Sequence, residues 1–478
     1  MAENPTYRAG FGFLVIACAA ASYYSRESPA KRVVAAKNAA ADNNNDLDTP
    51  IDPELPSPVS AERELAEFEL FKRNYLLVYS LVMTADWLQG PSTYPLYKYY
   101  GYDLAEIAIL FVVGFLSSAI FGTLIGSFAD KAGRKLACLV FCAIYSLSCL
   151  TKLSPTFTVL LFGRLLGGIS TSLLFSVFES WMVSEHHSRG FREVLLSDTF
   201  SWSTFLNGLV AIMSGILANF VSESYGFVAP FMASMFFLII AAVVVQTTWK
   251  ENYGSNKPSG SGGGGDSGKS SIREAAKAIW QDPAILAVGV MQCFFESAMY
   301  SFVFLWAPVL EHASASGNIP FGLVFAAFMV SIMIGSVVFK VMLRNGYKHE
   351  DIARVTFGVA TVALVIPIIA QDEITLFIAF NLFELCCGLY FPSLGTLRSK
   401  VVPEETRSTI MNVFRVPLNL IVVGVLLKVD AVASSTVFGV CALLLGVGFV
   451  FANRLRARLA DEAARPAKHV PLADQGGH

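Results

Sequence analysis

The sequence predicts an all-α polytopic membrane protein with 12 core membrane helices, arranged as two sets of six pseudo-repeats, and one extra N-terminal membrane helix. Three observations support this fold class. Of the 478 residues, 54% are hydrophobic and only 15% are charged, whereas a soluble chain of this size carries more charge. Apolar segments of about 20 residues, the length that crosses a bilayer, recur along the chain. A segment rich in glycine and serine at 259–268 divides these segments into the two sets.

The extra helix is expected within residues 1–30, which contain a short apolar run. Its segment Ala19–Ala21 resembles a signal-peptidase site. The flanking charges argue against cleavage, because Lys31 and Arg32 follow the run and only Arg8 precedes it. Since basic residues favour the cytoplasmic side, we expect an uncleaved helix with its N-terminus outside.

Residues 31–72 are predicted to form a cytoplasmic linker. Within it, residues 38–60 are rich in Asn, Asp, Pro and Ser, a composition typical of disorder, and residues 61–72 favour a short interfacial helix. The predicted core spans are 73–97, 104–127, 135–153, 156–184, 198–221, 226–249, 283–310, 320–343, 351–370, 373–400, 406–428 and 432–454. The expected domains are therefore a six-helix bundle at 73–249, a cytoplasmic Gly/Ser-rich central loop at 250–282, a second six-helix bundle at 283–455, and a cytoplasmic tail at 456–478.

A motif between the second and third core spans, at 126–135, reads G-x-x-x-D-x-x-G-R-K. Gly126 and Gly133 are expected to allow a tight reversal, and Asp130 to cap a helix or form a pair at the membrane face. Arg134 and two neighbouring lysines mark this loop as cytoplasmic. The alternative is an ordinary positively charged hairpin with no further role.

Six charged residues lie in the interior of predicted spans, away from the span ends, where a charge costs about 2.5–3.5 kcal/mol or more unless it faces a cavity or a partner. They are Asp86, Arg164, Glu179, Glu296, Glu384 and Arg415. Glu179 has a simple alternative, which is a pair with a basic loop residue at the cytoplasmic face. Arg164 has two alternatives, which are a structural role and proton coupling. A cluster of two arginines with three or four acids is able to hold an anion, protons, or both.

Other functional classes find little support. The 8 cysteines have no zinc-like spacing and indicate no disulfide framework, so no metal site is predicted. The 6 histidines fall in predicted loops, helix ends or the tail. A net charge of −2 gives no nucleic-acid footprint. Nothing resembles an ATP-binding loop, so neither an enzyme nor a primary pump is expected, and no cofactor is predicted.

Several stretches resemble the eukaryotic molybdate-anion transporter family of the major facilitator superfamily. They lie at 85–89, 150–154, 163–181, 295–297, 302–306, 387–393 and 414–418, and the resemblance covers about residues 70–455. It implies the major facilitator fold, in which helices 1, 4, 7 and 10 line a central cavity. The motif at 126–135 resembles that family's loop between helices 2 and 3, which implies a gating role for Gly126, Asp130, Gly133 and Arg134.

The resemblance also implies molybdate uptake by alternating access. Molybdate is a tetrahedral dianion, so its recognition calls for arginine forks and hydroxyl donors. We expect Arg415 as the main contact, Arg164 as the second, and Ser172 and Ser176 as hydroxyl donors. Moving a dianion inward costs about 4.6 kcal/mol per 100 mV, which two co-transported protons cancel. The candidate cavity acids for those protons are Asp86, Glu296, Glu384 and Glu179.

Two alternatives stay open at the level of sequence. The same fold is able to carry sulfate, another anion or an organic solute. A non-transporting membrane sensor or scaffold is also compatible with the long segments before and between the bundles. In either case we expect a monomer in the lipid bilayer, in the plasma membrane or alternatively an endomembrane.

Overall fold

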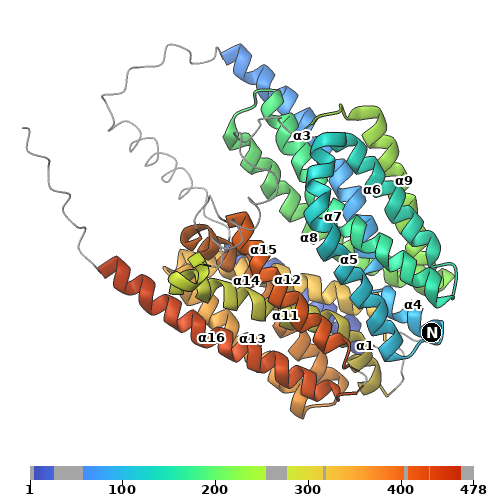
Figure 1. Ribbon diagram of the computed structural model, residues 1–478, viewed down its shortest axis with the longest axis vertical. Helices are drawn as coiled ribbons and strands as arrows, with labels where there is room; N and C mark the ends of the chain where they lie inside the picture. Colours follow the sequence, from blue (N-terminus) through green and yellow to red (C-terminus); the bar gives the residue numbers. More distant parts are fainter. Residues whose placement is uncertain are drawn as a thin grey trace, which may run out of the picture.

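The computed structural model describes residues 5–25, 58–253, 277–315, 319–402, 407–429 and 431–464. The regular secondary structure of these residues is entirely helical, as the sequence predicts (Figure 1). The predictions for the linker before residue 58, for most of the central loop and for the end of the tail fall on residues outside this description. The helices form two bundles, one from each half of the chain.

The N-terminal bundle holds six long helices and one short one. They are α3 (Pro58–Gln89), α4 (Thr93–Tyr99), α5 (Leu104–Ala132), α6 (Arg134–Thr151), α7 (Phe157–Ser188), α8 (Glu193–Tyr225) and α9 (Ala229–Thr248). α5 packs against α7, and α3 packs against both α8 and α9. The short α4 occupies the end of the first predicted span, because Gly90 and Pro91 interrupt the helix there.

α3 is one continuous helix from Pro58, whereas the sequence predicted a separate interfacial helix at 61–72. Residues 61–72 contain no glycine or proline, so nothing in them breaks the helix. Lys72, at the expected junction, is buried and forms ion pairs with Glu69 at 2.6 Å and with Asp198 of α8 at 2.7 Å. The extension of α3 is thereby tied to the N-terminal bundle.

The C-terminal bundle repeats the pattern of six long helices. They are α11 (Pro283–Ala313), α12 (Phe321–Arg344), α13 (His349–Ile369), α14 (Glu373–Val401), α15 (Arg407–Leu426) and α16 (Ser434–Ala464). Two of them begin at aspartate caps. Asp282 accepts a hydrogen bond from the Ala284 backbone N–H at 2.8 Å, and Asp372 accepts one from the Thr375 N–H at 2.9 Å.

Ten of the described helices are long and apolar enough to cross a membrane. They occupy ten of the 12 predicted core positions, and α3 and α15 fill the other two. α15 is not among the ten because its apolar stretch, Val413–Leu426, is too short. α3 carries a charged first third, which lowers its average apolarity.

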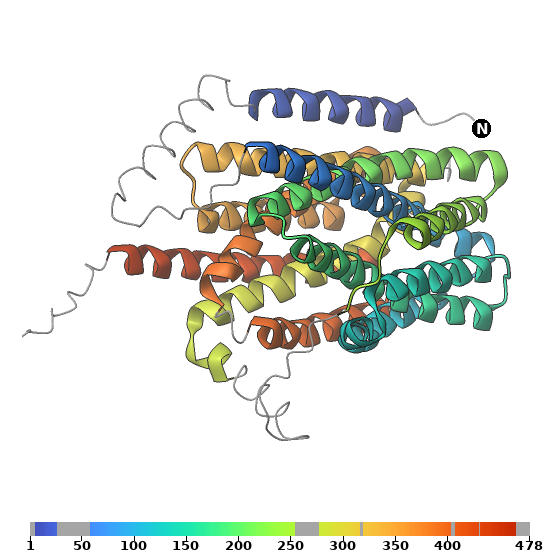
Figure 2. The same ribbon diagram turned by 90° about the horizontal axis from the view of Figure 1, so that it is seen from above.

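The additional helix α1 (Pro5–Ser25) packs against α12 at the edge of the molecule (Figure 2). The Tyr7 ring meets the Phe377 ring of α14 edge to face, with centroids 5.1 Å apart. Gly10 lies so close to the same ring that an added Cβ would be 2.8 Å from it. The first turns of α1 therefore lie beside the first turns of α14, and the two helices run in the same direction.

The two bundles meet at the end of the molecule where α4 lies, and they are inclined to each other (Figure 1). Lys98 of α4 forms an ion pair with Glu311 of α11 at 2.6 Å. An added Cβ on Gly215 of α8 would be 2.8 Å from the backbone oxygen of Gly322 of α12. The predicted topology places this end outside the cell.

Candidate functional site

The C-terminal bundle places a carboxylate on the face of α11 that α14 covers. The Tyr390 hydroxyl of α14 donates a hydrogen bond to Glu296 at 3.1 Å. The Tyr390 ring stacks on Phe295, with centroids 3.9 Å apart and an interplanar angle of 3°. Because this stacking restrains the tyrosine, its hydroxyl group is held where it meets the carboxyl group of Glu296.

Arg398, near the end of α14, points into the same region. Its side chain is half-buried, and its Nη1 donates to Oε1 of Gln292 at 3.3 Å. Gln292 is buried and also interacts with the Glu296 carboxyl group. One turn of α11 separates Gln292 from Glu296, so the two side chains share a face. Sequence reasoning missed Arg398 because it considered only the depth of the residue in its span.

Arg415 of α15 interacts electrostatically with this cluster. Its side chain is exposed, and it lies within Coulombic range of Glu296 and of Tyr300. The Tyr300 ring contacts Phe115 of α5, with centroids 5.4 Å apart, so this region is the boundary between the two bundles. Within the described part of the chain, Arg415 forms no ion pair or side-chain hydrogen bond.

Arg164 of α7 is directed to a different place. Its Nε donates to the backbone oxygen of Leu110 at 3.1 Å, and its guanidinium lies over the Phe111 ring, 4.8 Å from the centroid. An added Cβ on Gly114 would be 2.6 Å from its Nη2. Arg164 therefore joins α7 to α5 inside the N-terminal bundle, and the structure does not bring it together with Arg415.

The two predicted serine donors are engaged with backbone oxygens. The Ser172 hydroxyl donates to Ser118 of α5 at 2.9 Å, and the Ser176 hydroxyl donates to Ser172 at 2.7 Å. Hydroxyl groups that return to a preceding turn of their own helix are common in membrane helices. Their part in binding an anion stays a prediction.

The other predicted acids lie apart from one another. Asp86 of α3 accepts a hydrogen bond from the Tyr145 hydroxyl of α6 at 2.6 Å, inside the N-terminal bundle. Glu384 of α14 is buried and interacts with the neighbouring Cys387 thiol. Glu179 of α7 is exposed. Asp86 and Glu296 thus each meet a tyrosine hydroxyl, one in each bundle.

Lys152, just after α6, is a buried cation that sequence reasoning did not select. Only 2% of its surface is exposed, and its Nζ donates to the Tyr97 hydroxyl at 2.7 Å. The ammonium group also lies 5.0 Å from the Tyr97 ring centroid. Its position at the end of a predicted span does not reveal that it is enclosed, and the packing of α4 against it does.

The motif loop reverses at one glycine, not two. α5 continues to Ala132, so the prediction that Gly126 helps the turn is wrong. Helix-forming residues follow Gly126, and a single glycine costs a helix only about 1 kcal/mol. Gly133 makes the turn with a positive φ of 112°. The side chain of Asp130 lies outside the described residues, so its predicted pairing stays a prediction.

The segment after α9 contacts the C-terminal end of the motif loop, where α6 begins. Glu251 accepts hydrogen bonds from the backbone N–H groups of Lys135 at 2.7 Å and Leu136 at 3.0 Å, which caps the start of α6. The Arg134 N–H donates to the backbone oxygen of Asn252 at 2.9 Å. The motif loop is therefore attached to the beginning of the central loop.

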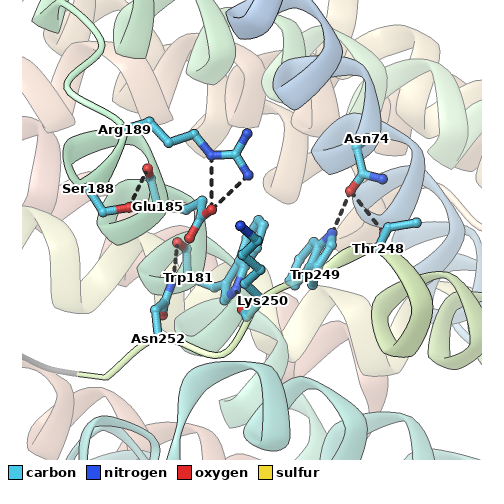
Figure 3. A network of polar contacts seen from close by, with 9 residues as sticks. All are labelled: Asn74, Trp181, Glu185, Ser188, Arg189, Thr248, Trp249, Lys250 and Asn252. Carbon is cyan, nitrogen blue, oxygen red and sulfur yellow. Dashed lines mark hydrogen bonds and ion pairs between the residues drawn. The ribbon is translucent and has the colours of Figure 1, made fainter.

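A polar and aromatic network anchors that segment (Figure 3). Trp181 of α7 stacks on Trp249 with centroids 3.6 Å apart. The Trp181 indole donates to the Lys250 backbone oxygen at 2.8 Å, and the Trp249 indole donates to Asn74 of α3 at 2.7 Å. The network joins α3, α7 and the end of α9 at the predicted cytoplasmic end.

Known proteins share this architecture. Residues 58–381 match the model of a family described as sugar transporters with 12 transmembrane segments. The solved structure of the nucleoside transporter NupG has a TM-score of 0.60 at 13% identity, covering 81% of this chain and 99% of that one. The POT family transporter PepTSo has a TM-score of 0.62 at 12% identity, covering 81% and 98%. The fold is that of a multi-pass membrane transporter of the major facilitator superfamily.

Closer relatives define the branch. The chain is 34% identical over 430 residues to a molybdate-anion transporter of Takifugu rubripes, covering 82% of this chain and 88% of that protein. It is 33% identical over 392 residues to a molybdate-anion transporter of Xenopus tropicalis, covering 79% and 84%. This chain belongs to the molybdate-anion transporter family, as its sequence motifs predicted.

Proposed function

We propose that this protein carries molybdate inward across the plasma membrane by alternating access. The observation that supports this most is the position of Arg415 at the boundary between the bundles, beside Glu296 and without an ion pair in the described residues. A guanidinium within a membrane helix is costly unless it has a partner. A tetrahedral dianion is such a partner, because the planar fork of arginine matches two of its oxygens.

Arg164, Ser172 and Ser176 are the second set of candidate contacts. All three are engaged with backbone oxygens of α5 or α7 in this structure. The two serine hydroxyls can donate to an anion only after they leave these backbone oxygens. Their contribution is therefore proposed for another step of the transport cycle.

Protons are the proposed coupling ions, with Asp86, Glu296 and Glu384 as carriers. Inward movement of a dianion against 100 mV costs about 4.6 kcal/mol, which two protons compensate. Asp86 and Glu296 each meet a tyrosine hydroxyl, which hydrogen-bonds either protonation state of a carboxyl group. We further propose that the protein works as a monomer.

Uptake of molybdenum into proteoliposomes with imposed pH and voltage gradients tests the function. Liposomes that contain the protein should accumulate molybdate, and an inward proton gradient should increase the rate. Empty liposomes and liposomes with the Arg415→Gln protein are the controls. Accumulation equal to that of empty liposomes contradicts the proposal. Equal inhibition by sulfate and by unlabelled molybdate would instead indicate a general carrier of tetrahedral dianions.

A further inference from the structure

Two helices of the C-terminal bundle, α14 and α15, converge on one face of α11. Gly289, Gln292 and Glu296 follow one another at helical spacing on that face. The Phe414 ring of α15 packs on Gly289, where an added Cβ would be 2.1 Å from Cε1 of the ring. Phe414 therefore fixes α15 against this part of α11, and the next residue, Arg415, points about 100° further round α15 and interacts electrostatically with Glu296.

α14 approaches the same face from the other side. Tyr390 reaches Glu296 at 3.1 Å, and further along α14 Arg398 reaches Gln292 at 3.3 Å. α11 and α14 run in opposite predicted directions, so the two contacts follow one another along the helices. Arg398 therefore enters this cluster from α14, while Arg415 enters it from α15.

Both guanidinium groups interact electrostatically with one carboxylate, and neither forms an ion pair among the described residues. Arg398 and Arg415 both lie within Coulombic range of Glu296. Neither forms an ion pair within 4.0 Å among the described residues, where Gln292 is the recorded side-chain partner of Arg398. Two cations around a single carboxylate leave one positive charge uncompensated. A bound dianion balances the two cations when it displaces the carboxylate and the carboxylate takes up a proton.

We propose that Arg398 and Arg415 together form the anion-binding clamp of this protein, and that Glu296 is their counter-ion when no anion is bound. Gln292 is a positioning residue, because its buried amide holds the Arg398 guanidinium. This inference rests on the proposed transport of a tetrahedral anion. In the conformation described here, the second arginine of the anion site is Arg398 and not Arg164.

The proposed clamp predicts that the protein binds dianions in preference to monoanions. Two guanidinium groups favour a doubly charged oxyanion such as molybdate over a singly charged one of similar shape such as perrhenate. Loss of one guanidinium should weaken dianion binding more than monoanion binding, because the Coulombic energy scales with the charge of the ligand. A residue that merely supports the fold would weaken the binding of both anions alike.

The test is equilibrium binding of molybdate and perrhenate to the purified full-length protein in nanodiscs. Arg398→Gln should weaken molybdate binding by about tenfold to a hundredfold, the effect of losing a charged hydrogen-bonding partner. The ratio of molybdate to perrhenate affinity should fall by about tenfold. Arg398→Lys keeps the charge but loses the fork, so it should weaken molybdate binding while largely keeping the preference for the dianion.

Lys400→Gln is the matched control, because Lys400 is exposed near the end of the same helix. It should bind both anions like the unmodified protein. If Arg398→Gln does not fold, Arg398→Lys decides alone, and unchanged molybdate affinity in that variant overturns the clamp. Equal weakening of both anions by Arg398→Gln also overturns it.

Binding measurements on the unmodified protein test the clamp and the proposed transport of molybdate separately. Binding of sulfate without binding of molybdate refutes molybdate transport, and the clamp is then judged with sulfate as the dianion. Binding of no tetrahedral dianion at all overturns both proposals.

Discussion

Lys98 of α4 and Glu311 of α11 join the two helix bundles through an ion pair of 2.6 Å. The Tyr94 hydroxyl also donates to Glu311, at 3.1 Å. A single carboxylate therefore receives two contacts from α4, at the end where the bundles meet.

The first prediction concerns this closure. Glu311→Gln should shift the protein toward a conformation that is open at the α4 end. A partly exposed ion pair contributes about 0.2–1 kcal/mol, which corresponds to a change of about 1.4-fold to fivefold in the conformational equilibrium. Distances between spin labels at Tyr225 and Ile369, which are exposed and end α8 and α13 on that side, should shift toward longer values.

Glu223→Gln provides the control for this measurement. Glu223 lies on the same side of the molecule and accepts a hydrogen bond only from Asn219 of its own helix among the described contacts. The distance distribution of this control should match that of the unmodified protein. An unchanged distribution in Glu311→Gln would show that the aromatic and glycine contacts alone close this end.

The second prediction concerns Arg415. Arg415→Lys keeps the charge but removes the planar fork, so the half-saturation concentration for molybdate should rise by about tenfold to a hundredfold. Lys400→Arg, at an exposed position near the end of α14, should have little effect. Both values are measured as uptake at matched surface expression. An unchanged half-saturation in Arg415→Lys would leave this residue a structural role only.

The third prediction concerns the carboxylates that are proposed to carry protons. Asp86→Asn, Glu296→Gln and Glu384→Gln are compared singly for accumulation driven by a pH gradient and for exchange of bound with free molybdate. Neutralising the coupling acid should abolish the pH-driven accumulation and spare the exchange. Full pH-driven accumulation in all three variants would assign the acids to structure and place the coupling elsewhere.

The fourth prediction concerns the motif loop and its attachment. Glu251→Ala removes the cap of α6 and should cost about 0.5–2 kcal/mol of stability. Asp130→Asn, within the motif, should slow transport while leaving equilibrium binding of molybdate largely intact, because the loop is proposed to control switching between conformations. Glu251→Ala should share this kinetic effect. Binding assays and uptake rates on the same preparations measure both, and a normally folded Asp130→Asn protein that binds no molybdate would contradict a gating role.

The sequence predicts the helices of this fold well, because spans of about 20 apolar residues are set by the thickness of the bilayer. Its errors are local. Gly126 was expected to turn the chain, but a lone glycine does not stop a helix whose next residues favour it. The separate helix at 61–72 was expected because its charges suggest an interface, and charge pattern alone does not reveal that Lys72 is buried against α8.

The sequence predicts the candidate site less completely than it predicts the fold. Depth in a span identified Arg415 and Glu296, but it does not show the direction of a long side chain. Arg398 lies near a helix end and still reaches inward to Gln292, whereas Arg164 lies deeper and is held by Leu110. Such differences depend on the packing of helices that are distant in the chain. They become visible only when α11, α14 and α15 are placed together.

The fifth prediction concerns α1, which lies outside the 12-helix core. Gly10 lies so near the Phe377 ring that an added Cβ would be 2.8 Å from it, whereas an added Cβ on Gly12 would meet nothing within 4 Å. Gly10→Val should therefore push α1 away from α14, while Gly12→Val leaves the contact intact. Both substitutions have the same small effect on helix propensity, so their difference reports the docking of α1 alone.

The readout is thermal stability in nanodiscs together with the rate of cleavage at a protease site placed directly after Ser25. Overpacking typically costs about 1–3 kcal/mol, so Gly10→Val should lower the midpoint of unfolding by several degrees and speed cleavage, and Gly12→Val should do neither. Because Tyr7 packs on the same ring, Tyr7→Ala should act in the same direction as Gly10→Val. If Gly10→Val and Gly12→Val behave alike, α1 does not rest on α14 in the membrane, and its packing against α12 must hold it alone.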